Sequence, residues 1–200
     1  MIDGSRECED WWSKAELADI IVFDLDGTLI DSDLANFLSY KAAAMHVLSC
    51  QVKMNFDPDI RITREKLAKI IPGICDIQLA RIVAQKERMY PQYLSKTTVN
   101  MQLVDIIERS KRKELILATN GRRSRADMLL DHHGLTDKFV GKIYWDAEDQ
   151  RDKYMRLGPG TLKEDRSIVV FENDTNDIKS AIACGIRADQ IINVCGTGDE

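Results

Sequence analysis

The chain has 200 residues, of which 44% are apolar and 30% are charged, and its formal net charge is −5. This length allows one domain or a core domain with an insert, and the composition is typical of a globular protein. The acidic balance argues against nucleic acid and against an anionic membrane as main partners. No apolar run approaches the ~18 residues of a membrane span, so we expect no membrane association.

The N-terminal segment and the cysteines indicate the compartment. Residues 1–17 are too polar to hold the apolar core of a signal peptide. The five cysteines are an odd number, are scattered and contain no Cys-x-x-Cys motif, which is typical of reduced thiols. We therefore expect a cytoplasmic protein, and the sequence leaves its oligomeric state open.

In chain order, the pattern predicts one strand, a helical segment, and then alternating helices and strands. A polar lead-in with Trp11 and Trp12 precedes the first strand, and residues 33–98 show helical spacing without a strong strand signal. The predicted strands are 20–23, 115–118, 143–145, 168–171 and 191–194. The predicted helices are 34–48, 64–71, 79–89, 101–111, 124–133, 152–157 (ended by Gly158-Pro159-Gly160) and 176–184.

This alternation predicts an α/β fold with a parallel sheet wound on both faces. We expect a core domain made of residues 1–32 and 99–200, and a small helical insert at residues 33–98. Ligands of open α/β sheets bind at the carboxyl ends of the strands. The residues that directly follow the strands are therefore the candidate site residues.

The most informative segment is the first strand with the turn after it. Four apolar residues, Ile20–Phe23, lead into Asp24-Leu25-Asp26-Gly27-Thr28. The strand therefore ends in two carboxylates, two residues apart, at the edge where ligands bind. Two acids at this place suit a metal ion together with chemistry in which one carboxylate attacks and the other handles a proton.

The run Asp24-Leu25-Asp26-Gly27-Thr28-Leu29 resembles the first motif of the haloacid dehalogenase (HAD) superfamily. The resemblance implies a Rossmann-like core with a helical cap inserted after the first strand. It also implies that Asp24 is the nucleophile and Asp26 the general acid and base, and the presence of Asp26 favours phosphate chemistry over dehalogenation. The family's other motifs are a Thr or Ser after the second strand, a Lys, and acidic residues after the fourth strand.

The second strand ends in Ala118-Thr119-Asn120-Gly121, which matches the second motif of the family at Thr119. The Thr119 hydroxyl, the Asn120 backbone and the N-terminus of the following helix would together bind a phosphate. Three arginines follow and could meet an anionic substrate, although a solvated helix start is the favoured interpretation. They are Arg122, Arg123 and Arg125.

The lysine of the family lies before the fourth strand, commonly as Lys-Pro, and this chain contains no Lys-Pro. Lys153, in Asp152-Lys153-Tyr154, is the best match by position. It would neutralise a phosphate oxygen and the Asp24 carboxylate. A solvated helix lysine is the competing interpretation, and Lys142 is the reserve candidate.

The fourth strand leads into Glu172-Asn173-Asp174, with Asp177 shortly after, and this segment resembles the acidic fourth motif. Asn173 stands where that motif has its metal-binding Asp. An amide oxygen can still ligate magnesium, but it is neutral. The ligands implied for Mg²⁺ are Asp24, Asp26 and Asn173, and the supporting acids are Glu172, Asp174 and Asp177.

Together, the resemblance implies a magnesium-dependent phosphatase that hydrolyses a phosphate monoester through an aspartyl-phosphate on Asp24. Its substrate would be a small phosphometabolite or a phosphoprotein, including phosphotyrosine. Two alternatives stay open: a phosphomutase or other phosphotransferase on the same site, and a non-catalytic binding module with the HAD fold. We expect residues 33–98 to form a cap over the carboxyl end of the sheet and to select the substrate.

Overall fold

The computed structural model describes residues 4–149, 151–158 and 166–194, with side chains from residue 10 onward. The chain divides into two compact units. Unit 1 contains Met1–Ile30 and Val99–Glu200, and unit 2 contains Asp31–Thr98. Each unit has its own cluster of buried apolar side chains.

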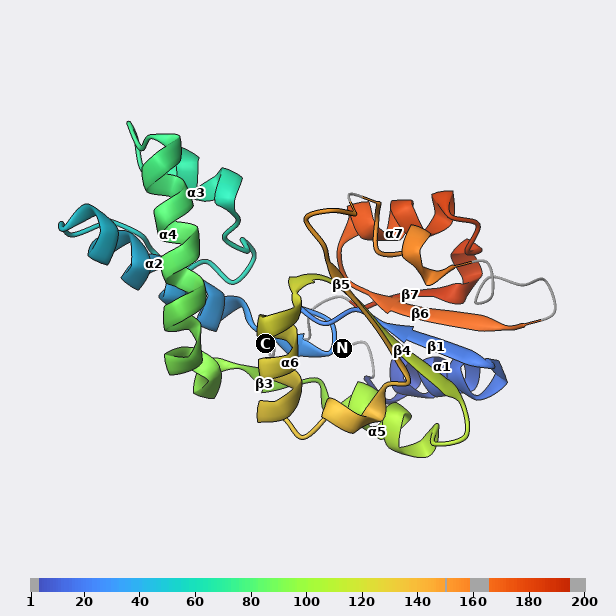
Figure 1. The fold of residues 1–200 in the computed structure, drawn as a ribbon. Coiled ribbons are helices and arrows are strands. Elements are labelled where there is room, and N and C mark those ends of the chain that lie inside the picture. Colours follow the sequence, from blue (N-terminus) through green and yellow to red (C-terminus); the bar gives the residue numbers. More distant parts are fainter. Residues whose placement is uncertain (1–3, 150, 159–165, 195–200) are drawn as a thin grey trace. The chain divides into compact units, whose positions relative to one another are not determined.

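Unit 1 is built on a parallel five-stranded sheet with the order β5-β4-β1-β6-β7 (Figure 1). The central strand β1 is buried along its whole length, which is why it is continuously apolar. The strands are β1 (Ile20–Phe23), β4 (Glu114–Arg122), β5 (Gly141–Trp145), β6 (Ile168–Glu172) and β7 (Ile191–Asn193). The predicted α/β class with a parallel sheet is confirmed.

Helices cover both faces of this sheet. Figure 1 shows α7 (Thr175–Ala183) on one face, and α1 (Gly4–Leu17) with α5 (Met101–Arg109) on the other. The helix α6 (Arg123–His132) follows β4 directly. Three short 3₁₀ helices complete the unit: η2 (Thr136–Lys138), η3 (Met155–Leu157) and η4 (Ala188–Gln190).

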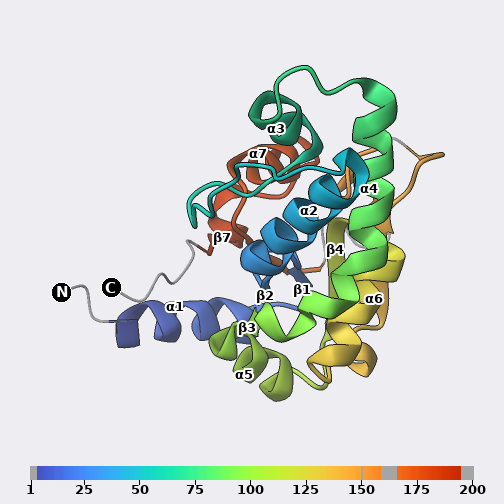
Figure 2. The ribbon, with the colours of Figure 1, turned by 90° about the vertical axis from the view of Figure 1, so that its left-hand side faces the viewer.

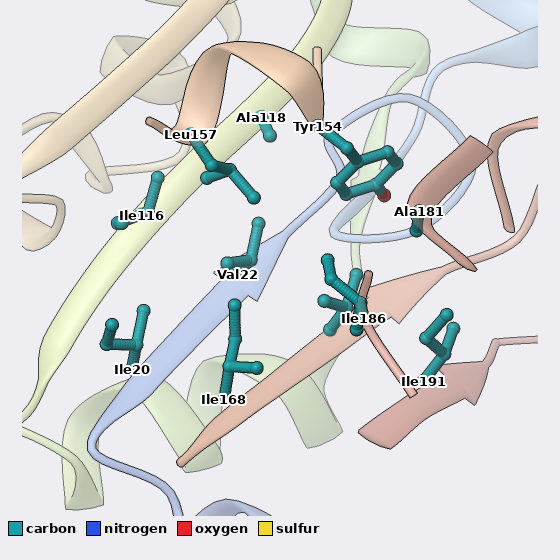
Figure 3. Close-up of a cluster of buried hydrophobic side chains, with 11 residues drawn as sticks. Ile20, Val22, Ile116, Ala118, Tyr154, Leu157, Ile168, Ala181, Ile186 and Ile191 are labelled. Atoms are coloured by element: carbon teal, nitrogen blue, oxygen red, sulfur yellow. The ribbon is translucent and has the colours of Figure 1, made fainter. Parts of the chain in front are cut away.

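The alternation of side chains along each strand determines which residues meet at the end of the sheet. Ile20 and Val22 of β1 belong to the cluster that also contains Val170 of β6 and Tyr154 (Figure 3). Successive side chains of a strand point to opposite faces. The residues that continue this face beyond Val22 and Val170 are Asp24 and Glu172, so both carboxylates are directed toward the face that holds Tyr154.

Unit 2 is helical. The helices α2 (Asp33–Leu48) and α4 (Asp76–Met89) pack against each other, as Figure 2 shows. The shorter α3 (Arg64–Ile70) and the 3₁₀ helix η1 (Tyr90–Lys96) complete the unit. Where the chain leaves and re-enters unit 1, β2 (Ile30–Asp31) and β3 (Thr98–Val99) form a separate two-stranded sheet.

Some elements differ from the sequence-based expectations. The polar lead-in forms the helix α1, whose Trp11 packs edge-on against Phe171 of β6. The strand predicted at 115–118 extends to Arg122 with an irregular register. The helix predicted at 152–157 is only the 3₁₀ helix η3, because the chain turns at Lys153 and Tyr154. Its predicted stop at Pro159-Gly160 lies outside the described residues.

Within the part of the chain that the structure describes, no helix combines the length and the apolarity that a membrane crossing requires.

Candidate active site

Asp24 follows directly after β1 and is almost fully buried. Its backbone N–H donates to the carbonyl of Phe171, which continues the pairing of β1 with β6. The Lys153 ammonium donates to Asp24 Oδ1 at 2.7 Å. Burial raises the pKa of Asp24 to about 7, and Lys153 opposes this rise. The motif residue is therefore a desolvated carboxylate with one fixed cationic partner.

Lys153 lies fully buried among three carboxylates. Its Nζ is 2.7 Å from Asp24 Oδ1, 2.7 Å from Glu172 Oε2 and 2.8 Å from Asp177 Oδ2. These anions hold the pKa of Lys153 well above its usual value against the opposing effect of burial. The reserve candidate, Lys142, instead donates to the Thr136 carbonyl. The ammonium at Asp24 is thus Lys153, although no proline follows it.

Glu172, at the end of β6, uses both of its carboxylate oxygens to hold neighbouring residues of this cluster. Its Oε2 accepts the hydroxyl hydrogen of Tyr154 at 2.6 Å, and its Oε1 accepts the backbone N–H groups of Asn173 and Asp174 at 2.9 Å each. Burial raises the pKa of Tyr154, and the nearby Glu172 carboxylate raises it further. Sequence reasoning missed Tyr154, and its position next to Lys153 was the only available signal.

The second motif lies at the irregular end of β4. Thr119 is buried, and its Oγ1 accepts the Gly121 backbone N–H at 2.9 Å, so the hydroxyl hydrogen can be donated to another group. Asn120 uses its amide to hold both oxygens of Asp177, at 2.9 and 3.2 Å. Asp177 therefore connects Lys153 with the segment that carries Thr119.

Asp26 is held by an arginine. Arg125 of α6 donates through Nη2 to Asp26 Oδ2 at 2.9 Å, and both side chains are largely buried. The neighbouring Arg123 pairs instead with Asp127 on its own helix and is exposed. The favoured prediction of a solvated helix start is therefore wrong for Arg125, because this side chain turns inward to the first motif.

Asn173 adjoins the turn that follows Asp26. Thr28 Oγ1 donates to Asn173 Oδ1 at 3.1 Å. Gly27 has a φ of +85°, and a Cβ built there would lie 2.5 Å from Asn173 Nδ2. Glycine is required here for both reasons: its backbone is left-handed, and the amide fills the space that a side chain would need.

Two groups of residues could hold a cation. The carboxylates of Asp24, Glu172 and Asp177 lie within 4.8 Å of one another. However, the Lys153 ammonium already contacts all three, so this cluster binds a lysine and is a poor metal site. The second set consists of Asp24, the Asp26 carbonyl and Asn173. All three offer oxygen, the ligand atom that Mg²⁺ prefers, so the donor chemistry of this set suits such an ion, with a neutral amide in place of one carboxylate.

Asp174 stabilises the start of α7. It is the N-cap of α7, and its Oδ1 accepts the backbone N–H groups of Asn176 at 2.7 Å and Asp177 at 3.1 Å. This oxygen is committed to orienting the first turn of α7, which carries Asp177. Its role as a ligand therefore has no geometric support.

These features place a cluster of buried charged and polar side chains at the carboxyl end of a parallel sheet, and the comparisons with known proteins identify the family of the chain. A sequence model of haloacid dehalogenase-like hydrolases matches residues 18–185. The chain belongs to this family, so the prediction of a HAD-type hydrolase is confirmed. No curated protein matches the chain.

Solved structures agree on the fold. A predicted phosphoglycolate phosphatase from Haemophilus somnus is 16% identical, with a TM-score of 0.71 over 88% of this chain and 85% of that one. CbbY from Rhodobacter sphaeroides, in complex with phosphate, is 18% identical, with a TM-score of 0.69 over 92% and 89%. A candidate β-phosphoglucomutase from Thermotoga maritima is 22% identical, with a TM-score of 0.66 over 91% and 88%.

Proposed function

We propose that the protein is a magnesium-dependent phosphatase that hydrolyses phosphate monoesters through an aspartyl-phosphate on Asp24. The observation that carries this proposal is the 2.7 Å contact between Asp24 and the fully buried Lys153. A buried carboxylate with a fixed cationic partner can approach a phosphate dianion, because the ammonium offsets part of the repulsion between the two anions.

In the first step, an Asp24 oxygen attacks phosphorus while the ester P–O bond breaks in line with it. Asp26 gives its proton to the leaving oxygen. In the second step, a water attacks the phosphorus of the aspartyl-phosphate and Asp26 takes the proton of that water. Inorganic phosphate leaves, Asp24 is regenerated, and Asp26 carries the proton again.

Thr119 and the Asn120 backbone would bind the phosphate oxygens, and the positive charge of Lys153 beside Asp24 would offset part of their negative charge. Thr119 suits this role because Gly121 occupies its acceptor side and the O–H can donate. Asp24, the Asp26 carbonyl and Asn173 would hold Mg²⁺. When bound, this ion supplies positive charge that offsets the charge of the transferring phosphoryl group.

We infer that unit 2 is a cap that selects the substrate. Its two ends join unit 1 at β2, which follows the turn after Asp26, and at β3, which leads into α5. The insert begins shortly after the first motif, and the pairing of β2 with β3 brings its end back to the same segment. A small phosphometabolite suits a cap that encloses the site, whereas a phosphoprotein needs a cap that leaves it open.

The proposed activity is tested by turnover of sugar phosphates, nucleotides and phosphopeptides with Mg²⁺ present and after its removal by a chelator. Asp24→Asn should lower kcat by more than about a hundredfold, since an amide cannot attack phosphorus, while the unfolding midpoint stays close to that of the wild type. A matched control is Asp19→Asn at the other end of β1, where the carboxylate accepts hydrogen bonds from the backbone N–H and the hydroxyl of Ser167.

Full activity in excess chelator, or in the Asp24→Asn variant, would overturn the proposal. Because one similar structure is described as a phosphoglucomutase, the screen also follows transfer of phosphate to a second sugar hydroxyl. Sustained transfer in place of hydrolysis would assign a phosphomutase. Failure of beryllofluoride to bind at Asp24, together with no turnover, would assign a binding module.

A further inference from the structure

The ion pair between Arg125 and Asp26 joins two segments that are 99 positions apart in the chain. Arg125 lies in the first turn of α6, and Asp26 lies in the turn after β1. The two side chains are only 14% and 12% exposed, whereas Arg123 on the same helix is 78% exposed. Solvent therefore screens the Arg125 pair much less than the Arg123 pair.

The pair also lies next to Gly121, in the segment that carries Thr119. A Cβ built on Gly121 would lie 3.0 Å from Arg125 Nη2, 3.1 Å from Thr119 Oγ1 and 3.3 Å from Asp26 Oδ2. The Arg125 guanidinium, the Thr119 hydroxyl and the Asp26 carboxylate thus surround one residue that has no side chain. Arg125 therefore contacts Asp26 on the side where Thr119 also lies.

We propose that Arg125 is a positioning residue for proton transfer: it holds Asp26 through Oδ2 and thereby fixes the orientation of the carboxyl group that transfers the proton. The proposal rests on the phosphatase function proposed above. In the first step the proton passes from the Asp26 carboxyl group to the leaving oxygen as the P–O bond breaks. In the second step the proton of the attacking water returns to the Asp26 carboxylate, and Arg125 keeps its own protons throughout.

A test must separate positioning of Asp26 from general damage to the site. General acid catalysis matters most when the leaving oxygen is a poor leaving group, and it matters little for 4-nitrophenolate. The value of kcat/KM reports formation of the aspartyl-phosphate, whereas kcat also contains its hydrolysis. We therefore use aryl phosphates of graded leaving-group pKa and one alkyl phosphate, with Mg²⁺ held constant.

For Arg125→Gln, kcat/KM for the alkyl phosphate should fall by about 10–100-fold, part of the 10²–10⁴ that general acid–base catalysis supplies. For 4-nitrophenyl phosphate, kcat/KM should change by less than about threefold, while kcat and KM fall together because Asp26 no longer assists hydrolysis of the aspartyl-phosphate. Arg125→Lys, which keeps the charge, should recover part of the loss. Arg123→Gln is the matched control and should behave as the wild type.

Action through Asp26 is tested by the double variant. Asp26→Asn should reproduce the selective loss on poor leaving groups, and adding Arg125→Gln should cause no further selective loss. Urea unfolding of the wild type, the two single variants Asp26→Asn and Arg125→Gln, and the double variant gives a readout that does not depend on activity. The losses of unfolding free energy from the two substitutions should be non-additive, because both remove the same ion pair.

An equal loss on all phosphates, additive unfolding, or an Arg125→Gln variant that matches the wild type would overturn the inference while the phosphatase function stands. A wild-type protein without turnover dependent on Asp24 would overturn the phosphatase function, and the inference with it.

Discussion

Lys153 is the residue on which the buried charges of the site depend. One ammonium contacts three carboxylates, so the cluster carries an excess of negative charge even with the lysine in place. Such a group is stable only because its oxygens have further donors: Tyr154 and two backbone N–H groups on Glu172, and Asn120 on Asp177. Buried charges are tolerated when they are paired and hydrogen-bonded.

Replacing Lys153 by Met should therefore destabilise the protein strongly. The carboxylates would remain buried without their cation, and removing one partner of a buried pair costs about 3–5 kcal/mol of unfolding free energy. Lys142→Met is the control, since it removes one hydrogen bond to a carbonyl and should cost about 1 kcal/mol. Urea unfolding without metal measures both, and equal losses would contradict the buried cluster.

At Asn173, a neutral amide stands where the family motif has a metal-binding carboxylate. If its amide oxygen ligates Mg²⁺, Asn173→Asp should lower the dissociation constant for Mg²⁺ by on the order of tenfold, because a charged ligand replaces a neutral one. Calorimetric titration of Mg²⁺ measures this without turnover. The control Asn176→Asp adds the same charge in the exposed first turn of α7. An equal gain in Mg²⁺ affinity in both variants would indicate that the added charge attracts the ion at long range and that residue 173 is not a ligand.

At the scale of elements, the connection from β6 to α7 organises the site within a few residues. Glu172 ends the strand, Asp174 caps the helix, and Asp177 faces Lys153 from the first helical turn. The α7 cap thus determines where Asp177 lies. Through Asp177, it also influences Asn120 at the end of β4.

Removal of the Asp174 N-cap should loosen the first turn of α7 without affecting a metal ligand. Asp174→Ala should cost about 1 kcal/mol of unfolding free energy, the usual effect of losing an N-cap acceptor, and Asp174→Ser should keep most of it. The dissociation constant for Mg²⁺ should be unchanged in the Ser variant. A weaker Mg²⁺ affinity in Asp174→Ser would show that the Asp174 carboxylate takes part in binding the ion.

The sequence was sufficient for features that depend on local pattern. Apolar strands followed by polar residues located Asp24, Thr119 and Glu172, because parallel strands bring their carboxyl ends to one edge. It was insufficient for contacts set by tertiary packing. Nothing near Arg125 in the chain indicates its pairing with Asp26, and nothing near Tyr154 indicates the hydrogen bond to Glu172. The helix α1 was missed because its sequence is mostly polar.

At the scale of the whole molecule, the chain consists of two units with separate apolar clusters. The cluster of unit 1 joins sheet residues with Tyr154 and Ala181, and the cluster of unit 2 joins α2, α3 and α4. The two crossings between the units are adjacent, because β2 pairs with β3. A short linker can therefore replace unit 2 without stretching the chain of unit 1.

Replacement of Asp31–Thr98 by a short Gly/Ser linker should leave unit 1 able to unfold cooperatively, because its core residues all belong to unit 1. The shortened protein should hydrolyse 4-nitrophenyl phosphate slowly and lose this activity on Asp24→Asn, which shows that the same nucleophile acts. Unit 2 is expected to restrict the full-length protein to small esters. In the shortened protein, the ratio of phosphopeptide turnover to small-ester turnover should therefore rise by at least about tenfold, because unit 2 no longer discriminates between the two substrates. An unchanged ratio would contradict a substrate-selecting cap, and loss of cooperative unfolding would show that unit 1 needs unit 2 to fold.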